Sequence, residues 1–133
     1  MILLLISVSP RSPVITNTTD DIGSGRRVIW ATEDSQITIV CQVRGGNPES
    51  SVKWLHGDVS GSDLTMSNYV QHNADNTYDV TSTVTVMVRR SEDRAIYVCQ
   101  AEHRTWTSPQ NASLELYLYL RPGELVMSDP GNL

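Results

Sequence analysis

Three histidines and two cysteines are the residues of this 133-residue chain with the most capacity for chemistry, as metal ligands, nucleophiles or proton carriers. Zinc sites draw their ligands from closely spaced pairs such as C-x-x-C or H-E-x-x-H, whereas His56, His72 and His103 stand apart in the sequence. Ser, His and Asp are all present, but the Gly-x-Ser-x-Gly turn that exposes a catalytic serine is absent. We therefore expect no catalytic residue, no metal site, no cofactor and no small-molecule substrate.

The charge of the chain argues against a nucleic-acid partner. Its formal net charge is -5 at pH 7, and its paired arginines, Arg26–Arg27 and Arg89–Arg90, are isolated from other basic residues. Binding to phosphates requires a clustered basic surface. The sequence therefore predicts no nucleic-acid binding.

Composition and the chain ends indicate one domain with flanking segments. Hydrophobic residues make up 39% of the chain and Phe is absent, so Val, Ile, Leu, Trp and Tyr must fill the core, which favours strands. The apolar run Ile2–Ile6 is too short to cross a membrane and has no basic residue before it. We expect residues 1–12 to be a linker or the end of a preceding domain, 13–121 the domain, and 122–133 a C-terminal linker or tail.

Apolar residues at a period of two predict strands separated by turns. In the stretch 36–43, Ile37, Ile39, Cys41 and Val43 fall on one face, and the other face carries Thr38, Val40 and Gln42. No helix of convincing length is indicated, and six to eight short strands would form an all-β antiparallel sandwich or barrel. The stretches that we expect to be strands are 36–43, 51–56, 80–88, 95–103 and 112–120.

The two cysteines and two glycosylation motifs bear on the compartment. Cys41 and Cys99 each lie on the inward face of an expected strand, and Asn17 and Asn111 begin Asn-x-Ser/Thr triplets. An even number of cysteines with such triplets is typical of secreted and extracellular domains. From the residues alone, a pair of buried free thiols in a cytosolic protein stays open as the alternative.

One combination of residues resembles the signature of the immunoglobulin superfamily. Its parts are Cys41, then Trp54, then the run Asp-x-Ala-x-Tyr-x-Cys that ends at Cys99. The resemblance covers about residues 13–121. It implies an immunoglobulin-like antiparallel β-sandwich of Greek-key topology, with a disulfide between Cys41 and Cys99 that joins the sheets and Trp54 packed on it. It also implies that Tyr97 hydrogen-bonds back across the corner between the expected strands 80–88 and 95–103, where Asp93 would sit.

Further features resemble the C2-type second domain of nephrin-like and nectin-like cell-surface receptors. They are the turn Gly45-Gly46-Asn47-Pro48, a proline-containing start, and a last strand without the Gly-x-Gly bulge of variable-type domains. The segment before Cys41 is longer than the family usually shows. Trp30 within that segment would be either a core residue of an added strand or a cover over an open sheet edge.

The resemblance implies an extracellular domain of a membrane-anchored or secreted cell-surface receptor that recognises protein without catalysis, in adhesion or in immune-type signalling. Its partner would be a second copy, another cell-surface protein or a neighbouring immunoglobulin domain. If the strands alternate as expected, a possible binding face carries Leu55, Val98, Tyr117 and Tyr119 on its outer side. The alternative is that these are ordinary scattered surface residues.

Two further alternatives stay open at this stage. Trp106 would make an interdomain contact or bind a foreign partner. The domain as a whole would recognise a partner, or it would be a structural spacer that positions a neighbouring recognition domain and binds nothing itself.

Overall fold

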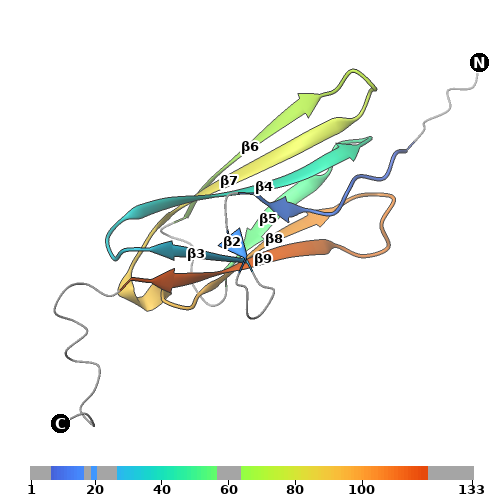
Figure 1. Cartoon of the computed structure of the whole chain (residues 1–133). Helices are drawn as coiled ribbons and strands as arrows, with labels where there is room; N and C mark the ends of the chain where they lie inside the picture. The colour runs from blue at the N-terminus through green and yellow to red at the C-terminus, as the bar shows by residue number, and fades with distance from the viewer. Residues whose placement is uncertain (1–6, 17–18, 21–26, 57–63, 120–133) are drawn as a thin grey trace, which may run out of the picture.

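The computed structural model describes residues 7–16, 19–20, 27–56 and 64–119, which form two β-sheets packed face to face (Figure 1). One short 3-10 turn, η1, lies between the seventh and eighth strands. The elements in chain order are β1 (Val14–Ile15), β2 (Thr19–Asp20), β3 (Arg27–Ala31), β4 (Gln36–Gly46), β5 (Ser51–Leu55), β6 (Leu64–His72), β7 (Tyr78–Met87), η1 (Arg90–Glu92), β8 (Ile96–Glu102) and β9 (Gln110–Leu118).

The strand order confirms the expected all-β sandwich. One sheet has the order β1-β4-β7-β6 and the other the order β2-β3-β9-β8-β5. Neighbouring described strands are antiparallel except β3 and β9, which run parallel. If β4 is the second strand of the immunoglobulin pattern, the four-stranded sheet has the A-B-E-D order. The C2 subtype stays a prediction.

The five expected strands correspond to β4, β5, β7, β8 and β9, with ends that differ by a few residues. The long strand β6 was not predicted, and neither were the short strands β1, β2 and β3 as separate elements. β6 pairs along its whole length with β7, from Leu64 opposite Val86 to His72 opposite Tyr78. The four-stranded sheet therefore ends in a strand that the sequence analysis did not predict.

The core lies between the sheets and is centred on the predicted disulfide. Cys41 in β4 and Cys99 in β8 are bonded with an S–S distance of 2.05 Å, and both are fully buried. Alternation on β7 buries Ser82 together with its valines, as the period of two indicated. The largest fully buried apolar side chains around the disulfide are Ile15, Ile39, Val84, Val86, Val88, Tyr97, Leu114 and Leu116.

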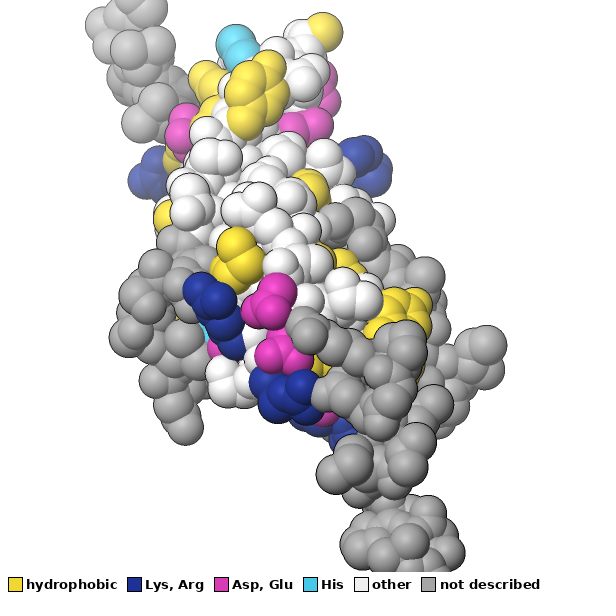
Figure 2. Space-filling model, turned by 90° about the vertical axis from the view of Figure 1, so that its left-hand side faces the viewer, with side chains coloured by type: hydrophobic (Ala, Val, Ile, Leu, Met, Phe, Trp, Pro, Cys, Tyr) yellow, Lys and Arg dark blue, Asp and Glu magenta, His cyan; other side chains and the backbone are white. Residues whose placement is uncertain are grey.

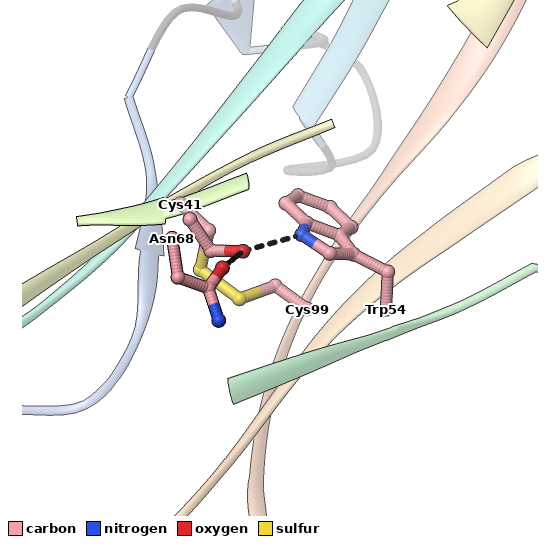
Figure 3. The surroundings of a disulfide bond; sticks show 5 residues. Cys41, Trp54, Asn68 and Cys99 are labelled. Atoms are coloured by element: carbon pink, nitrogen blue, oxygen red, sulfur yellow. Dashed lines mark hydrogen bonds between the residues drawn. A yellow bond between two sulfur atoms is a disulfide. The ribbon is translucent and has the colours of Figure 1, made fainter. Parts of the chain in front are cut away.

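A chain of hydrogen bonds crosses the core beside the disulfide (Figure 3). The indole Nε1–H of Trp54 in β5 donates to Ser82 Oγ at 2.9 Å, and the Ser82 hydroxyl donates to Asn68 Oδ1 at 2.6 Å. Ser82 is in β7 and Asn68 in β6, so these two hydrogen bonds link one sheet to the edge strand of the other. A buried hydroxyl would be costly without partners, and here it has one on each side.

Candidate functional site

The outer side of the five-stranded sheet carries the residues that the sequence proposed as a binding face. Leu55 in β5 lies opposite Val98 in β8, and the side chain of Leu55 is 40% exposed. Two residues along β8 from Val98, Ile96 is 47% exposed on the same side. The same side presents Tyr117 in β9, which is half-buried, and Tyr119 just after the strand, which is 54% exposed.

Trp30 joins these tyrosines: it lies in an added strand, as one expectation had it, but its side chain is not in the core. It lies in β3 opposite Tyr117, and its ring centroid is 4.9 Å from that of Tyr117 and 5.3 Å from that of Tyr119. Because Ala31 faces the core, its neighbour Trp30 must face outward, and it is 47% exposed. Trp30 is thus a surface residue of the added strand and not a core residue.

A cation completes this group of rings. The guanidinium carbon of Arg94 lies 4.8 Å from the centroid of the Tyr117 ring, within the range of a cation–π contact. Arg94 follows η1 in the left-handed region, with φ 69°, and its N–H donates to the Leu116 carbonyl at 2.6 Å. We call Trp30, Arg94, Tyr117 and Tyr119 the aromatic cluster.

The aromatic cluster and Leu55 lie on the same side of the five-stranded sheet. Between them, Ile96 pairs with Glu115, and Glu115 pairs with Val28 on β3. Glu115 has the same outward parity as Tyr117, yet it is only 8% exposed, so the polar centre of this side is covered rather than open. We call the outward side chains Leu55, Ile96 and Val98 together with the aromatic cluster the recognition face.

Several of these residues were missed from the sequence. Ile96 could have been found, because it continues the outward alternation of Val98 and Gln100 on the same strand. Trp30 and Arg94 could not, because their positions depend on a parallel pairing and on a left-handed turn that no local pattern specifies.

One glycosylation motif lies on the same sheet. Asn111 in β9 is exposed, pairs with Gln100, and shares the outward parity of Tyr117. Six residues of strand separate Asn111 from Tyr117, which is about 20 Å along the chain. A glycan on Asn111 would therefore cover the opposite end of the sheet and leave the aromatic cluster open. Asn17, the other candidate acceptor, lies outside the described residues.

The corner between β7 and β8 holds a buried polar group. The Tyr97 hydroxyl donates to Glu92 Oε1 in η1, and the imidazole of His56 stacks on the Tyr97 ring with centroids 4.0 Å apart. His56 Nε2 lies 2.8 Å from the same Glu92 oxygen, at an angle that does not make it a hydrogen bond. Burial, followed by the hydrogen bond to Glu92, raises the pKa of the Tyr97 phenol well above its ordinary value. Asp93 sits in this corner, and its Oδ1 accepts the Leu118 N–H at 3.0 Å.

This corner can stabilise the fold but offers little to a substrate. His56, Glu92 and Tyr97 are all nearly or fully buried. Within the described residues, no three His, Cys, Asp or Glu side chains gather closely enough to hold a metal ion.

Trp106 contacts the N-terminal segment of the same chain. Its indole Nε1–H donates to Ser9 Oγ at 3.1 Å, and the Thr105 hydroxyl donates to the same oxygen at 3.0 Å. The segment is tied down further by Val8, whose N–H donates to the Asn47 carbonyl at 2.8 Å. Residues 7–12, expected as a linker, are thus hydrogen-bonded to the sandwich; the domain boundaries stay a prediction.

In the described part of the chain, no helix is long and apolar enough to cross a membrane.

The sequence and the fold are similar to those of known proteins. The model of a family described as "Immunoglobulin domain" matches residues 12–103. Cell adhesion molecule 2 of Xenopus tropicalis is 25% identical over 120 residues, which are 90% of this chain and 25% of that protein. This chain therefore spans about a quarter of the length of its curated relative.

Two solved structures have a similar fold. The structure of Rst D1-D2 superposes with a TM-score of 0.70 and 23% identity, over 85% of this chain and 51% of that one. The full ectodomain (Ig1-Ig3) of mouse nectin-like molecule 4 superposes with a TM-score of 0.65 and 21% identity, over 84% of this chain and 35% of that one.

Proposed function

The chain belongs to the immunoglobulin domain family, and from that premise we propose that it is an extracellular domain of a cell-surface receptor that recognises protein without catalysis. The recognition face binds the partner, which is a second copy or another cell-surface protein. The similarity to a cell adhesion molecule supports a role of the adhesion type over a role in immune signalling.

The aromatic cluster is the observation that carries this proposal. Tyr, Trp and Arg are the residue types that dominate binding energy at protein interfaces. Trp30 and Tyr119 leave about half of their surface in solvent, although each already contacts a neighbouring ring. Rings that already pack against one another lose little side-chain freedom on binding, so more of the energy of burial remains for affinity.

The alternative function is a structural spacer that holds a neighbouring recognition domain in place and binds nothing. Figure 2 supports this alternative for one side of the molecule: apart from a small group at the top, its hydrophobic side chains are scattered, and its middle is mostly backbone and side chains that are neither hydrophobic nor charged. The hydrogen-bonded N-terminal segment is what a fixed spacing to a preceding domain would require.

Sedimentation velocity on the oxidised, glycosylated domain over a wide concentration range separates the two functions. Trp30→Ser/Tyr119→Ser removes the exposed rings of the recognition face, and Val14→Ser, on the other sheet and 45% exposed, is the matched control. In parallel, beads coated with each variant are tested for binding to a panel of cells. Dimerisation or cell binding that is lost in the double variant and kept in Val14→Ser supports recognition. A monomer that binds no cell would favour the spacer.

A further inference from the structure

Strand β6 is a long and regular sheet edge. It lies at the outer edge of the four-stranded sheet (Figure 1), and its nine residues pair with β7 without a register shift. Every described side chain from Thr65 to His72 is exposed. One long side of this strand therefore presents its backbone N–H and C=O groups to an additional strand.

β6 lacks the features by which proteins usually protect a sheet edge. Such protection comes from short strands, charged residues, proline or a bulge. The sequence LTMSNYVQH contains no Asp, Glu, Lys, Arg or Pro. The other described edges differ: β1 and β2 have two residues each, and β5 has five residues with Lys53 at its centre. Among these edges, only β6 is both long and free of charge.

Side chains on both sides of β6 remain available. Asn68 points between the sheets, since it accepts the Ser82 hydroxyl, and Met66 and Val70 share its parity. Met66 is nevertheless 49% and Val70 39% exposed, because no strand continues the sheet beyond them. On the opposite side Tyr69 is 64% exposed.

The turn that joins β6 to β7 holds the edge in place. The Asn73 N–H donates to the Thr77 carbonyl at 2.8 Å, and the Thr77 hydroxyl donates to Asp75 Oδ1 at 2.6 Å. This bond is the main cause that lowers the pKa of the Asp75 carboxyl below its usual value. A partner strand would meet an edge that is already ordered, which reduces the entropy lost on binding.

We propose that β6 pairs antiparallel with β6 of a second copy of this chain, about a two-fold axis at Asn68, and so joins the two four-stranded sheets into one. The proposal rests on the β6 edge and does not require the recognition face.

The sequence of β6 is self-complementary in this register. Met66 of one copy lies opposite Val70 of the other on the inner side, and Ser67 lies opposite Tyr69 on the outer side. Cross-strand pairs of apolar residues and of an aromatic with a hydroxyl residue are favourable, and no like charges meet. Because the same pairs occur on both sides of Asn68, a second copy satisfies the edge as one symmetric contact.

Charge reversal across the edge tests the proposal in sedimentation experiments on the whole chain. Ser67→Lys/Tyr69→Lys places two lysine pairs directly opposite each other, and we expect it to weaken self-association at least about tenfold. Ser67→Glu/Tyr69→Lys places Glu opposite Lys twice, and we expect it to retain self-association. Thr83→Lys/Thr85→Lys adds the same charge on β7, one strand inward, and is the control that should resemble the unmodified chain.

The proposal is overturned if the unmodified chain stays monomeric at high concentration, or if the two β6 variants associate equally well. If Trp30→Ser/Tyr119→Ser abolishes association and Ser67→Lys/Tyr69→Lys does not, the recognition face is the interface, and only the β6 pairing fails. The converse result leaves the β6 pairing in place and removes self-recognition through the aromatic cluster.

A cysteine trap tests the register even if a lysine variant fails to fold. Opposite residues in an antiparallel pair have Cα atoms about 4.5–5.5 Å apart, within the range of a disulfide. Asn68→Cys lies opposite itself and should form a disulfide-linked dimer under mild oxidation. Ser67→Cys, two positions out of register with its own copy, should form far less. Equal linkage of the two variants, or none of Asn68→Cys, would contradict the proposed axis.

Discussion

The phenol of Tyr97 donates its hydrogen bond to the carboxylate of Glu92, which lies five residues earlier in the turn that enters the strand. In immunoglobulin sandwiches the tyrosine at this position bonds to the backbone of the corner. Here a buried acid takes that role, and the His56 ring stacks on the same tyrosine. The corner is therefore fixed by side chains, and one of them, the Tyr97 phenol, has a pKa that the fold raises.

Tyr97→Phe should lower the free energy of unfolding by about 1.5–3 kcal/mol, because it takes a hydrogen bond from a buried, charged acceptor. Urea unfolding near neutral pH measures the change. Tyr78→Phe is the matched control, since no hydrogen bond to the Tyr78 hydroxyl is found among the described residues. Similar values for both variants would mean that the Tyr97–Glu92 bond adds nothing to stability.

Alkaline pH should destabilise the domain through the same phenol. Burial and Glu92 raise the pKa of Tyr97 in the folded state, whereas in the unfolded chain it ionises near its ordinary value of about 10. The folded state thus keeps a proton that the unfolded chain loses. The contribution is complete below about pH 10 and is lost above it, at a limiting slope of about 1.4 kcal/mol per pH unit. Urea midpoints of the unmodified protein and of Tyr97→Phe should converge above that pH, and parallel curves would exclude this linkage.

Ser82→Ala should destabilise the domain by about 1–3 kcal/mol, because it leaves the Trp54 indole N–H and the Asn68 side chain without their shared partner. The loss should also loosen β6, so amide hydrogen exchange around Asn68 should speed up more than exchange in β8. Thr83→Ala, the adjacent position on the outer side of β7, controls for the removal of a hydroxyl. An equal effect of the two substitutions would indicate that the chain of bonds from Trp54 is not important.

The sequence predicted β4, β5, β7, β8 and β9 because one face of each packs against the core, fully or in part, and packing on one face is what produces a period of two. β6 has no such contrast. Met66 and Val70 are apolar on its inner side and Tyr69 is aromatic on its outer side, since a strand at the edge is exposed on both. The position of β6 at the edge of its sheet therefore explains both why its sequence pattern does not predict a strand and why its backbone edge is open.

The recognition face could be predicted only in part for a similar reason. Val98, Tyr117 and Tyr119 follow from alternation within one strand. In β3, however, Val28, Ile29, Trp30 and Ala31 are apolar on both sides, so the pattern does not tell which residue faces outward. The parallel pairing with β9, a contact between segments far apart in the sequence, decides it. Glu92, the acceptor of the Tyr97 hydroxyl, could likewise not be predicted, because its position depends on the conformation of η1.

Trp106→Ala should change the stability of the isolated domain by no more than about 1 kcal/mol, because its side chain is only half-buried and lies outside the core. The substitution should instead free the N-terminal segment, since it removes the hydrogen bond to Ser9. Hydrogen exchange of the Val8 amide, which bonds to Asn47, should accelerate while exchange in β7 stays unchanged. These two readouts separate a role at the N-terminal junction from a role in the core.

Gly46→Ala should also free the N-terminal segment, by a steric effect that is independent of Trp106. A Cβ on Gly46 would lie 3.0 Å from Pro10 Cβ and 3.2 Å from His103 Nε2, so the N-terminal segment or the loop after β8 must move. We expect this variant to accelerate exchange at Val8 as Trp106→Ala does. A loss of several kcal/mol on Trp106→Ala, with slow exchange at Val8, would instead make Trp106 part of the core. It would remove the case for this loop as a contact between domains.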